Sequence, residues 1–205
     1  MTAVHRRGSY AKGVAKREEI LERALDVIAR EGFRGASVRE LAEAVGLSQA
    51  GLLHYFDSKE ELFTAILRKR DEVDFNRFGP VDPGTGDTPL LRERYVEVVR
   101  RTADVPGLVE LFARLAVDAA DPAHPAHPYF VERGDAVRAA LTTTIVRLQQ
   151  DGELTDAIDA PVLARVLQAV VDGLQVQWML DPGVDMAGTL DALFEVLATR
   201  PGDAS

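Results

Sequence analysis

Residues 48–54 bring together side chains suited to contacting nucleic-acid bases. Ser48, Gln49 and His54 carry hydroxyl, amide and imidazole groups, and Leu53 adds an apolar surface. On a short helix over residues 49–56 these side chains lie towards the N-terminal and outer face, which DNA-binding helices present to the major groove. The chemistry indicated is base recognition, since the sequence has no Ser/His/Asp nucleophile pattern and no phosphate-binding glycine loop.

The neighbouring residues predict how that helix is held. A capping box, Ser37-x-x-Glu40, starts the preceding helix, and Gly46 ends it with a left-handed C-cap. Ser48 is the next N-cap, so only a tight turn separates the two helices, as in a helix-turn-helix. A second capping box at residues 58–61 opens a third helix. We therefore expect Leu52 and Phe56 to point inward from the second helix.

These residues carry a resemblance to a known family. The run HYFDSKEEL at residues 54–62 resembles the most recurrent signature of the TetR family of transcriptional regulators, and the helix over residues 16–31, followed by Gly32-Phe33, resembles the family's first helix. The specific part spans residues 16–67. The resemblance implies base contacts by Ser48, Gln49, Ala50, Leu53 and His54, phosphate contacts by Tyr55 and Lys59, and a place for Ser37 in the same interface.

Two positions depart from the family pattern. Gly51 stands where the family often has Thr, Ser or Ala, and Leu53 stands where Tyr is common. We expect one aromatic DNA contact to be absent, which affects the operator sequence more than the fold.

The composition is that of a globular chain. Its 205 residues are 46% apolar and 28% charged, with no cysteine and hence no disulfide or thiolate metal site. Neither a signal peptide nor a run of about 18 apolar residues occurs, so we expect no membrane association and a cytoplasmic location.

The charge is distributed unevenly. Residues 1–70 hold 13 Lys and Arg against 10 Asp and Glu, whereas residues 71–205 hold 11 against 23. An overall charge of −9 would disfavour nucleic-acid binding if it were spread evenly, but the N-terminal part of the chain is basic. Residues 1–15 form a basic and flexible tail in this interpretation, either solvated or acting as a phosphate-contacting arm.

Apolar periodicity predicts an all-α fold with about nine helices. A homeodomain-like, three-helix domain over residues 16–67 is followed by a helical ligand-binding and dimerisation domain over residues 68–200. Gly, Pro and Asp over residues 79–87 mark the clearest loop. The later helices are expected at residues 59–75, 88–103, 108–120 and 129–150, and from Pro161 and Met186 onward.

The eighth helix has an apolar surface too wide for a helix packed on one side only. By the family resemblance, the last two helices pair with their copies in a second subunit. The residues assigned to this homodimer interface are Leu163, Leu167, Val170, Leu174, Leu190 and Phe194.

Two further clusters have residue types that bind ligands. His124-x-x-His127 lies near two aspartates, but prolines follow both histidines in a loop that cannot hold ligands convergent, so we expect no metal site. A small, mostly apolar effector is expected in the C-terminal domain, although aromatic residues at helical spacing are more often core. Its candidate contacts are Phe112, Tyr129, Gln175 and Trp178.

Taken together, the sequence predicts a homodimeric DNA-binding transcriptional regulator that acts as a repressor on a pseudo-palindromic operator and is released by a small molecule. No cofactor and no enzymatic activity are expected. The alternative is a helical enzyme or ligand carrier with an incidental three-helix subdomain. The basic N-terminal part and the absence of catalytic motifs favour the regulator.

Overall fold

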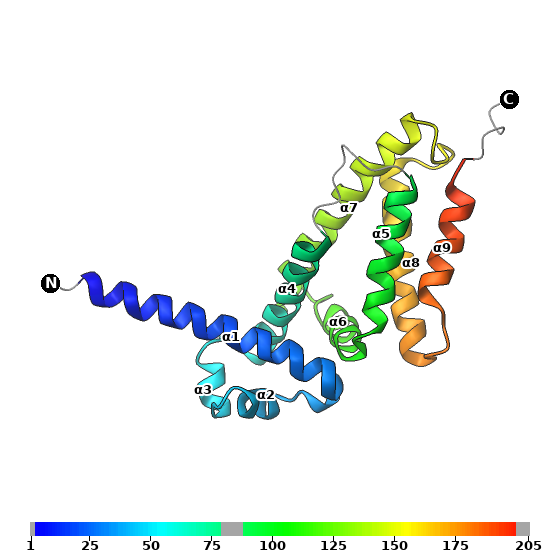
Figure 1. Cartoon of the computed structure of the whole chain (residues 1–205). Coiled ribbons are helices and arrows are strands. Elements are labelled where there is room, and N and C mark those ends of the chain that lie inside the picture. Colours follow the sequence, from blue (N-terminus) through cyan, green and yellow to red (C-terminus); the bar gives the residue numbers. More distant parts are fainter. Residues whose placement is uncertain (1–2, 79–87, 200–205) are drawn as a thin grey trace. The chain divides into compact units, whose positions relative to one another are not determined.

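A computed structural model describes the chain over residues 3–78 and 88–199 (Figure 1). Nine α-helices and no β-strand occur within these ranges, which confirms the predicted all-α fold. Contacts divide the chain into two compact units. Unit 1 comprises Met1–Val73 and Val105–Ala126, and unit 2 comprises Asp74–Asp104 and His127–Ser205.

Unit 1 is built on a long first helix. It contains α1 (Ala3–Gly35), α2 (Val38–Ala44), α3 (Gln49–Leu53), α4 (Lys59–Phe78) as far as Val73, and α6 (Pro106–Asp118). α1 starts at Ala3, so the backbone of residues 3–15, expected as a tail, is helical. No proline interrupts this stretch, which explains why the helix can extend so far.

Gly32 interrupts α1 where the sequence predicts its end. Its φ of 73° and ψ of 171° are not helical, and a last turn follows to Gly35. Glycine adopts this conformation without the steric cost that a Cβ atom would impose. The chain then redirects into α2, which packs against α1.

The core of unit 1 is apolar and closely packed. Ile20, Val27 and Ile28 of α1 are buried, as are the predicted inward residues Leu52 and Phe56. α6 also packs against α1. The sequence places a domain boundary after Leu67, whereas contacts group α6 with the first four helices and divide the chain after Val73.

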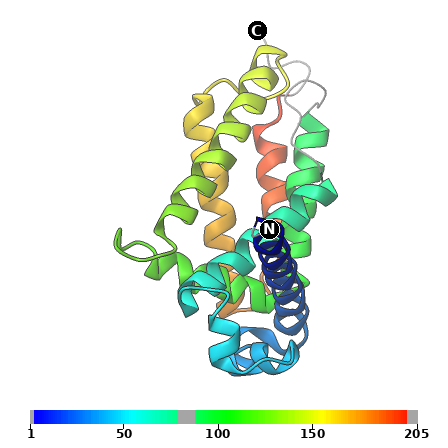
Figure 2. The same cartoon turned by 90° about the vertical axis from the view of Figure 1, so that its left-hand side faces the viewer.

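Unit 2 contains the last residues of α4 and a bundle of four further helices. Figures 1 and 2 show α5 (Thr88–Ala103), α7 (His127–Gln150), α8 (Ala160–Leu180) and α9 (Met186–Leu197) lying alongside one another. α8 packs against α7 and α9, and α9 packs against α5. An isolated antiparallel bridge between Leu154 and Ala198 joins the α7–α8 loop to the end of α9. Buried residues from all four helices form one core.

Several helix limits differ from those predicted. α3 ends at Leu53 rather than Phe56, because the N–H of Tyr55 bonds to the carbonyl of Leu52, three residues earlier. α4 extends to Phe78, where no Pro or Gly intervenes. α7 begins at His127 rather than Tyr129, since a proline is tolerated in the first turn of a helix.

Candidate nucleic-acid interface

The capping box of α2 is present. The N–H of Ser37 donates to Oε2 of Glu40 at 2.8 Å, and the N–H of Glu40 donates to Oγ of Ser37 at 3.4 Å. The Ser37 hydroxyl, and then its backbone N–H, lower the pKa of Glu40. Ser37 is exposed, but its side chain already has a structural role at the start of α2.

The turn between α2 and α3 is equally defined. Gly46 has a φ of 69°, and the N–H of Leu47 returns to the carbonyl of Ala42 at 2.9 Å. Ser48 then caps α3 by accepting the N–H of Gly51 at 3.0 Å. The short connection and the two serine caps form the predicted helix-turn-helix.

The outer face of α3 carries most of the predicted base-contacting groups. Ser48, Gln49, Ala50 and His54 are exposed. Leu52 beneath them has no exposed surface, and Leu53 is half-buried. A buried apolar residue thus anchors a polar surface whose amide and imidazole groups can hydrogen-bond to base edges.

The predicted phosphate-contacting residues follow directly. Tyr55 is half-buried, with its ring edge-on to that of His54 at 5.9 Å. Lys59 is exposed in the first turn of α4, and its Nζ lies 5.6 Å from the centroid of the Phe63 ring. The helix start is fixed by Ser58, whose Oγ accepts the N–H of Glu61 at 3.0 Å.

One residue near this surface has a role that spacing does not reveal. Arg17 of α1 lies over the Phe56 ring, with Cζ 4.6 Å from its centroid. The same guanidinium donates to Oε1 of Glu61 at 2.5 Å. From the sequence, Arg17 is recognised only as a basic residue, because its partner lies 44 positions away and no local pattern connects them.

The predicted effector contacts are divided between the two units. Phe112 belongs to unit 1, where the Arg70 guanidinium lies 5.2 Å from its ring centroid. Tyr129, Gln175 and Trp178 belong to unit 2. Tyr129 is buried against Phe130, with ring centroids 4.9 Å apart. Trp178 packs on the unit 2 core.

Unit 2 also contains polar groups that no sequence pattern singles out. Burial, and then the negative charge of Asp172, raise the pKa of the Tyr95 phenol well above its ordinary value, against an opposing effect of Arg133. Partial desolvation also raises the pKa of Asp172, although that residue is exposed. Tyr95 is half-buried against the apolar core of unit 2, so its phenol is a hydrogen-bonding group at the edge of that core.

The residues assigned to the dimer interface lie inside the single chain. Leu163, Leu167, Leu174, Leu190 and Phe194 are buried in the core of unit 2, and Val170 packs partly against it. Their side chains are therefore occupied by intrachain contacts. The large exposed apolar residues of the same two helices are Val162, Val166, Val176, Leu180 and Val196.

The histidine pair has ordinary structural surroundings. Nδ1 of His124 accepts the N–H of Ala126 at 3.1 Å, and His127 is the first residue of α7. Across residues 3–78 and 88–199, no three His, Asp or Glu side chains are grouped as metal ligands would be. Within the same ranges, no helix combines the length and apolar character needed to cross a membrane.

The capped α2–turn–α3 arrangement, with an exposed polar face on α3, defines a helix-turn-helix DNA-binding protein. The chain matches the family model of bacterial regulatory proteins of the tetR family over residues 20–66. It also matches the C-terminal model of BetI-type transcriptional repressors over residues 126–200.

Relatives and solved structures agree with these matches. The repressor AcnR of Corynebacterium glutamicum is 30% identical over 162 residues, covering 79% of this chain and 81% of that protein. The regulator PksA of Bacillus subtilis is 30% identical over 169 residues, covering 82% and 80%. A TetR-family regulator from Agrobacterium tumefaciens has the same fold, with a TM-score of 0.71 at 20% identity over 91% of this chain and all of that one. The chain belongs to the TetR family of transcriptional regulators.

Proposed function

We propose that this regulator is a repressor that binds a two-fold symmetric operator as a homodimer and releases it when a small molecule binds. The observation that carries DNA recognition is the exposed surface of Ser48, Gln49, Ala50 and His54 above the buried Leu52. Within this proposal, residues 16–67 form the DNA-binding domain and residues 68–200 the effector and dimerisation domain.

The groups on this surface divide into two kinds of contact. Gln49 and His54 offer donors and acceptors to base edges, and Leu53 offers an apolar contact to a thymine methyl group. Lys59 and Tyr55 are suited to phosphate oxygens, which fix register without reading sequence. Ser48 and Ser37 help mainly by holding α3 and α2 in place, since both hydroxyls serve as caps.

Dimerisation is supported by one stripe of exposed apolar residues on α8. Val162, Val166, Val176 and Leu180 recur at spacings that place them on one side of a helix, and exposed Ala169 lies in the same stripe. A side chain such as Leu180, 83% exposed, is favourably covered by a matching surface. A second copy of α8 supplies such a surface in a two-fold dimer.

Effector binding is assigned to unit 2. Tyr129, Gln175 and Trp178 supply aromatic and amide groups there, and the half-buried Tyr95 adds a phenol. A mostly apolar molecule with one or two hydrogen-bonding groups suits side chains of these kinds. α4 contributes residues to both units, and this continuity makes it the element through which we expect the effector to act.

The direct experiment is a gel-shift titration with duplexes from the DNA flanking the gene of this protein. A sequence-specific complex that a competing unrelated duplex does not displace is the expected result. Repeating the titration with Gln49→Ala protein checks that binding uses the α3 surface. Equal affinity for every duplex, in both proteins, would contradict the proposal.

A further inference from the structure

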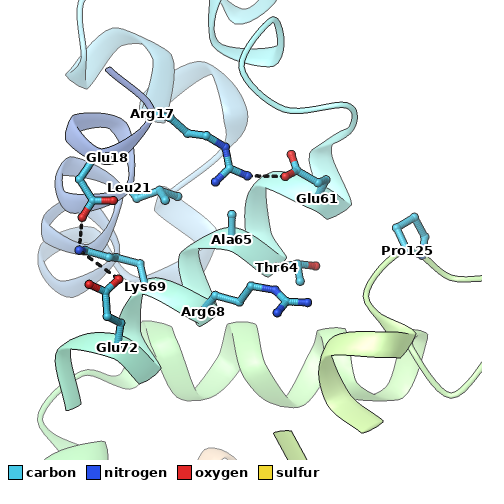
Figure 3. A pocket seen from close by; sticks show the side chains of 10 residues that line it. All are labelled: Arg17, Glu18, Leu21, Glu61, Thr64, Ala65, Arg68, Lys69, Glu72 and Pro125. Carbon is cyan, nitrogen blue, oxygen red and sulfur yellow. Dashed lines mark hydrogen bonds and ion pairs between the residues drawn. The ribbon is translucent and has the colours of Figure 1, made fainter. Parts of the chain in front are cut away.

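Arg17 connects α1 to two neighbouring positions that lie far from it in sequence. It extends from α1 to the Phe56 ring, which follows α3, and to Glu61 in the first turn of α4. Figure 3 shows the guanidinium directed at the Glu61 carboxylate. The two side chains border an open cavity of about 340 Å³ between α1 and α4, and the Arg17 side chain is 40% exposed.

Glu61 depends on this partner. Its N–H is bound by Ser58, and its Oε1 accepts from Arg17. Its other oxygen, Oε2, is buried and accepts no hydrogen bond from any residue in the described part of the chain. A carboxylate in this position is unfavourable unless a cation compensates it, so losing Arg17 would force the side chain or the helix start to move.

The contacts of Arg17 lie close in sequence to residues predicted to touch DNA. Phe56 lies two residues after His54, and Glu61 lies two residues after Lys59. Because Arg17 holds Phe56 and Glu61 against α1, it restrains the path of residues 54–59 relative to the rest of unit 1. A displacement of a contacting group by about 1 Å is enough to weaken an interaction that depends on geometry.

We propose that Arg17 is a positioning residue, which with Phe56 and Glu61 holds residues 54–59 in the conformation that binds DNA, without contacting DNA itself. The inference rests on the proposed function. Its distinguishing feature is that an acidic residue, Glu61, assists the binding of a polyanion.

A second pair of charges ties the same two helices further along. The Lys69 ammonium of α4 donates to Glu18 of α1, and Nζ of Lys69 lies 3.4 Å from Oε2 of Glu72. Because Lys69 lies two helical turns beyond Glu61, this pair holds α1 and α4 together away from residues 54–59. Loss of this pair should lower the stability of the fold with less effect on DNA affinity. A variant of this pair therefore serves as a control for loss of stability alone.

The test measures DNA affinity and its salt dependence for single and double variants, on the duplex that the wild-type protein selects from a randomised library. Arg17→Ala and Glu61→Gln should each weaken binding by about tenfold, and the double variant by little more than either. Neither should change the slope of log K against log salt, because neither side chain meets a phosphate in this proposal.

Glu60→Gln is the matched control, since it removes the same charge from the same helical turn. Loss of a negative charge alone should leave affinity unchanged or raise it slightly. Glu18→Gln should lower the unfolding midpoint while changing DNA affinity less than Glu61→Gln does. Arg17→Lys, which keeps the charge and the ion pair, should recover part of the affinity lost in Arg17→Ala.

The outcomes distinguish failure of the proposed function from failure of the role of Arg17. If the wild-type protein selects no duplex, the proposed function fails. If it selects one and Glu61→Gln binds as tightly as Glu60→Gln, only the role of Arg17 is overturned. A salt slope reduced by about one unit in Arg17→Ala would instead identify Arg17 as a phosphate contact, which would also overturn its role as a positioning residue. If Arg17→Ala does not fold, the comparison of Glu61→Gln with Glu60→Gln still tests whether the ion pair supports DNA binding.

Discussion

A Cβ atom added to Gly107 would stand 2.9 Å from Cα of Gly32, so α6 approaches α1 at a point where two glycines face each other. The carbonyl oxygen of Ile28 and the N–H nitrogen of Phe33 would lie closer still, at 2.7 and 2.8 Å. All three neighbours are backbone atoms, which cannot turn aside as a flexible side chain can.

Gly107→Ala should therefore destabilise the protein. Overpacking of this kind costs about 1 to 3 kcal/mol of the free energy of unfolding. Urea denaturation measures the loss. Gly13→Ala is the control, because its Cβ would meet no atom within 4 Å and alanine favours a helix over glycine. Equal stability of the two variants would show that α6 and α1 can separate without cost.

Gln49→Ala and Lys59→Ala should weaken DNA binding in different ways. The first should cost about 1 to 3 kcal/mol and relax preference at one base pair, since an exposed amide reads a base edge. The second should weaken binding to every sequence and lower the salt slope by about one unit, because a phosphate contact is lost. Fluorescence anisotropy across a panel of single-base variants distinguishes the two patterns, and an equal loss of specificity from both would contradict the assignment.

Val166→Glu should convert the protein to a folded monomer. Val166 is 41% exposed on the α8 stripe, and a charge there would be buried without a partner in the dimer. Val117→Glu on α6 introduces the same charge at a position that is 75% exposed and lies outside the stripe, so it should leave the mass unchanged. Sedimentation equilibrium measures both masses, and a dimer that survives Val166→Glu combined with Val162→Glu would exclude this face.

The ion pair between α5 and α9 should make stability depend on pH. Nε and Nη2 of Arg92 donate to the two carboxylate oxygens of Asp191 at 2.6 and 2.8 Å, and these bonds lower the pKa of Asp191 below its ordinary 3.8. A carboxyl with a lowered pKa stabilises the folded state fully above 3.8, and the effect is lost as the pH falls through the lowered value.

The measurable consequence is how the stability of a variant, relative to wild type, changes with pH. Arg92→Gln should be less stable than wild type at neutral pH, and the difference should shrink below pH 3.8. Arg165→Gln is the control, at an exposed position on α8. Its difference in stability from wild type should not change as Asp191 becomes protonated. Thermal unfolding at several pH values, with a carboxyl titration of Asp191 by NMR, checks both expectations.

An effector found by thermal-shift screening should act reciprocally with DNA. A coupling of about 1 to 3 kcal/mol would lower operator affinity about 5- to 150-fold, and operator DNA would lower effector affinity by the same factor. Trp178→Phe should weaken the effector without changing affinity for DNA alone. A tight ligand of unit 2 that leaves operator affinity unchanged would refute the release mechanism for that compound.

Local chemistry was readable from the sequence. The caps at Ser37 and Ser48 and the left-handed Gly46 are present as predicted, because each depends on residues within a few positions of one another. The inward direction of Leu52 and Phe56 follows from the same short-range pattern. The capped helix-turn-helix and the apolar residues beneath it could therefore be predicted from the sequence alone.

Choices between equivalent faces were not readable. α8 has two apolar sides, and the prediction places Leu163, Leu167 and Leu174 against a second subunit. The structure packs them in the core of unit 2 and leaves Val162 and Val166 exposed, because α7 and α9 cover the leucine side. The partners of Arg17 were hidden for a related reason, since only the folded chain brings Glu61 beside it.

The bridge between Leu154 and Ala198 has a consequence for how the bundle comes apart. The N–H of Thr155 bonds to the carbonyl of Leu197 at 2.9 Å, and the N–H of Thr199 bonds to that of Glu153 at 3.1 Å. These two bonds close a ring of chain that runs through α8 and α9, so α9 cannot fray from its C-terminal end until both have broken. The amide protons of Thr155 and Thr199 should exchange with solvent together, as one cooperative opening rather than as a loose end.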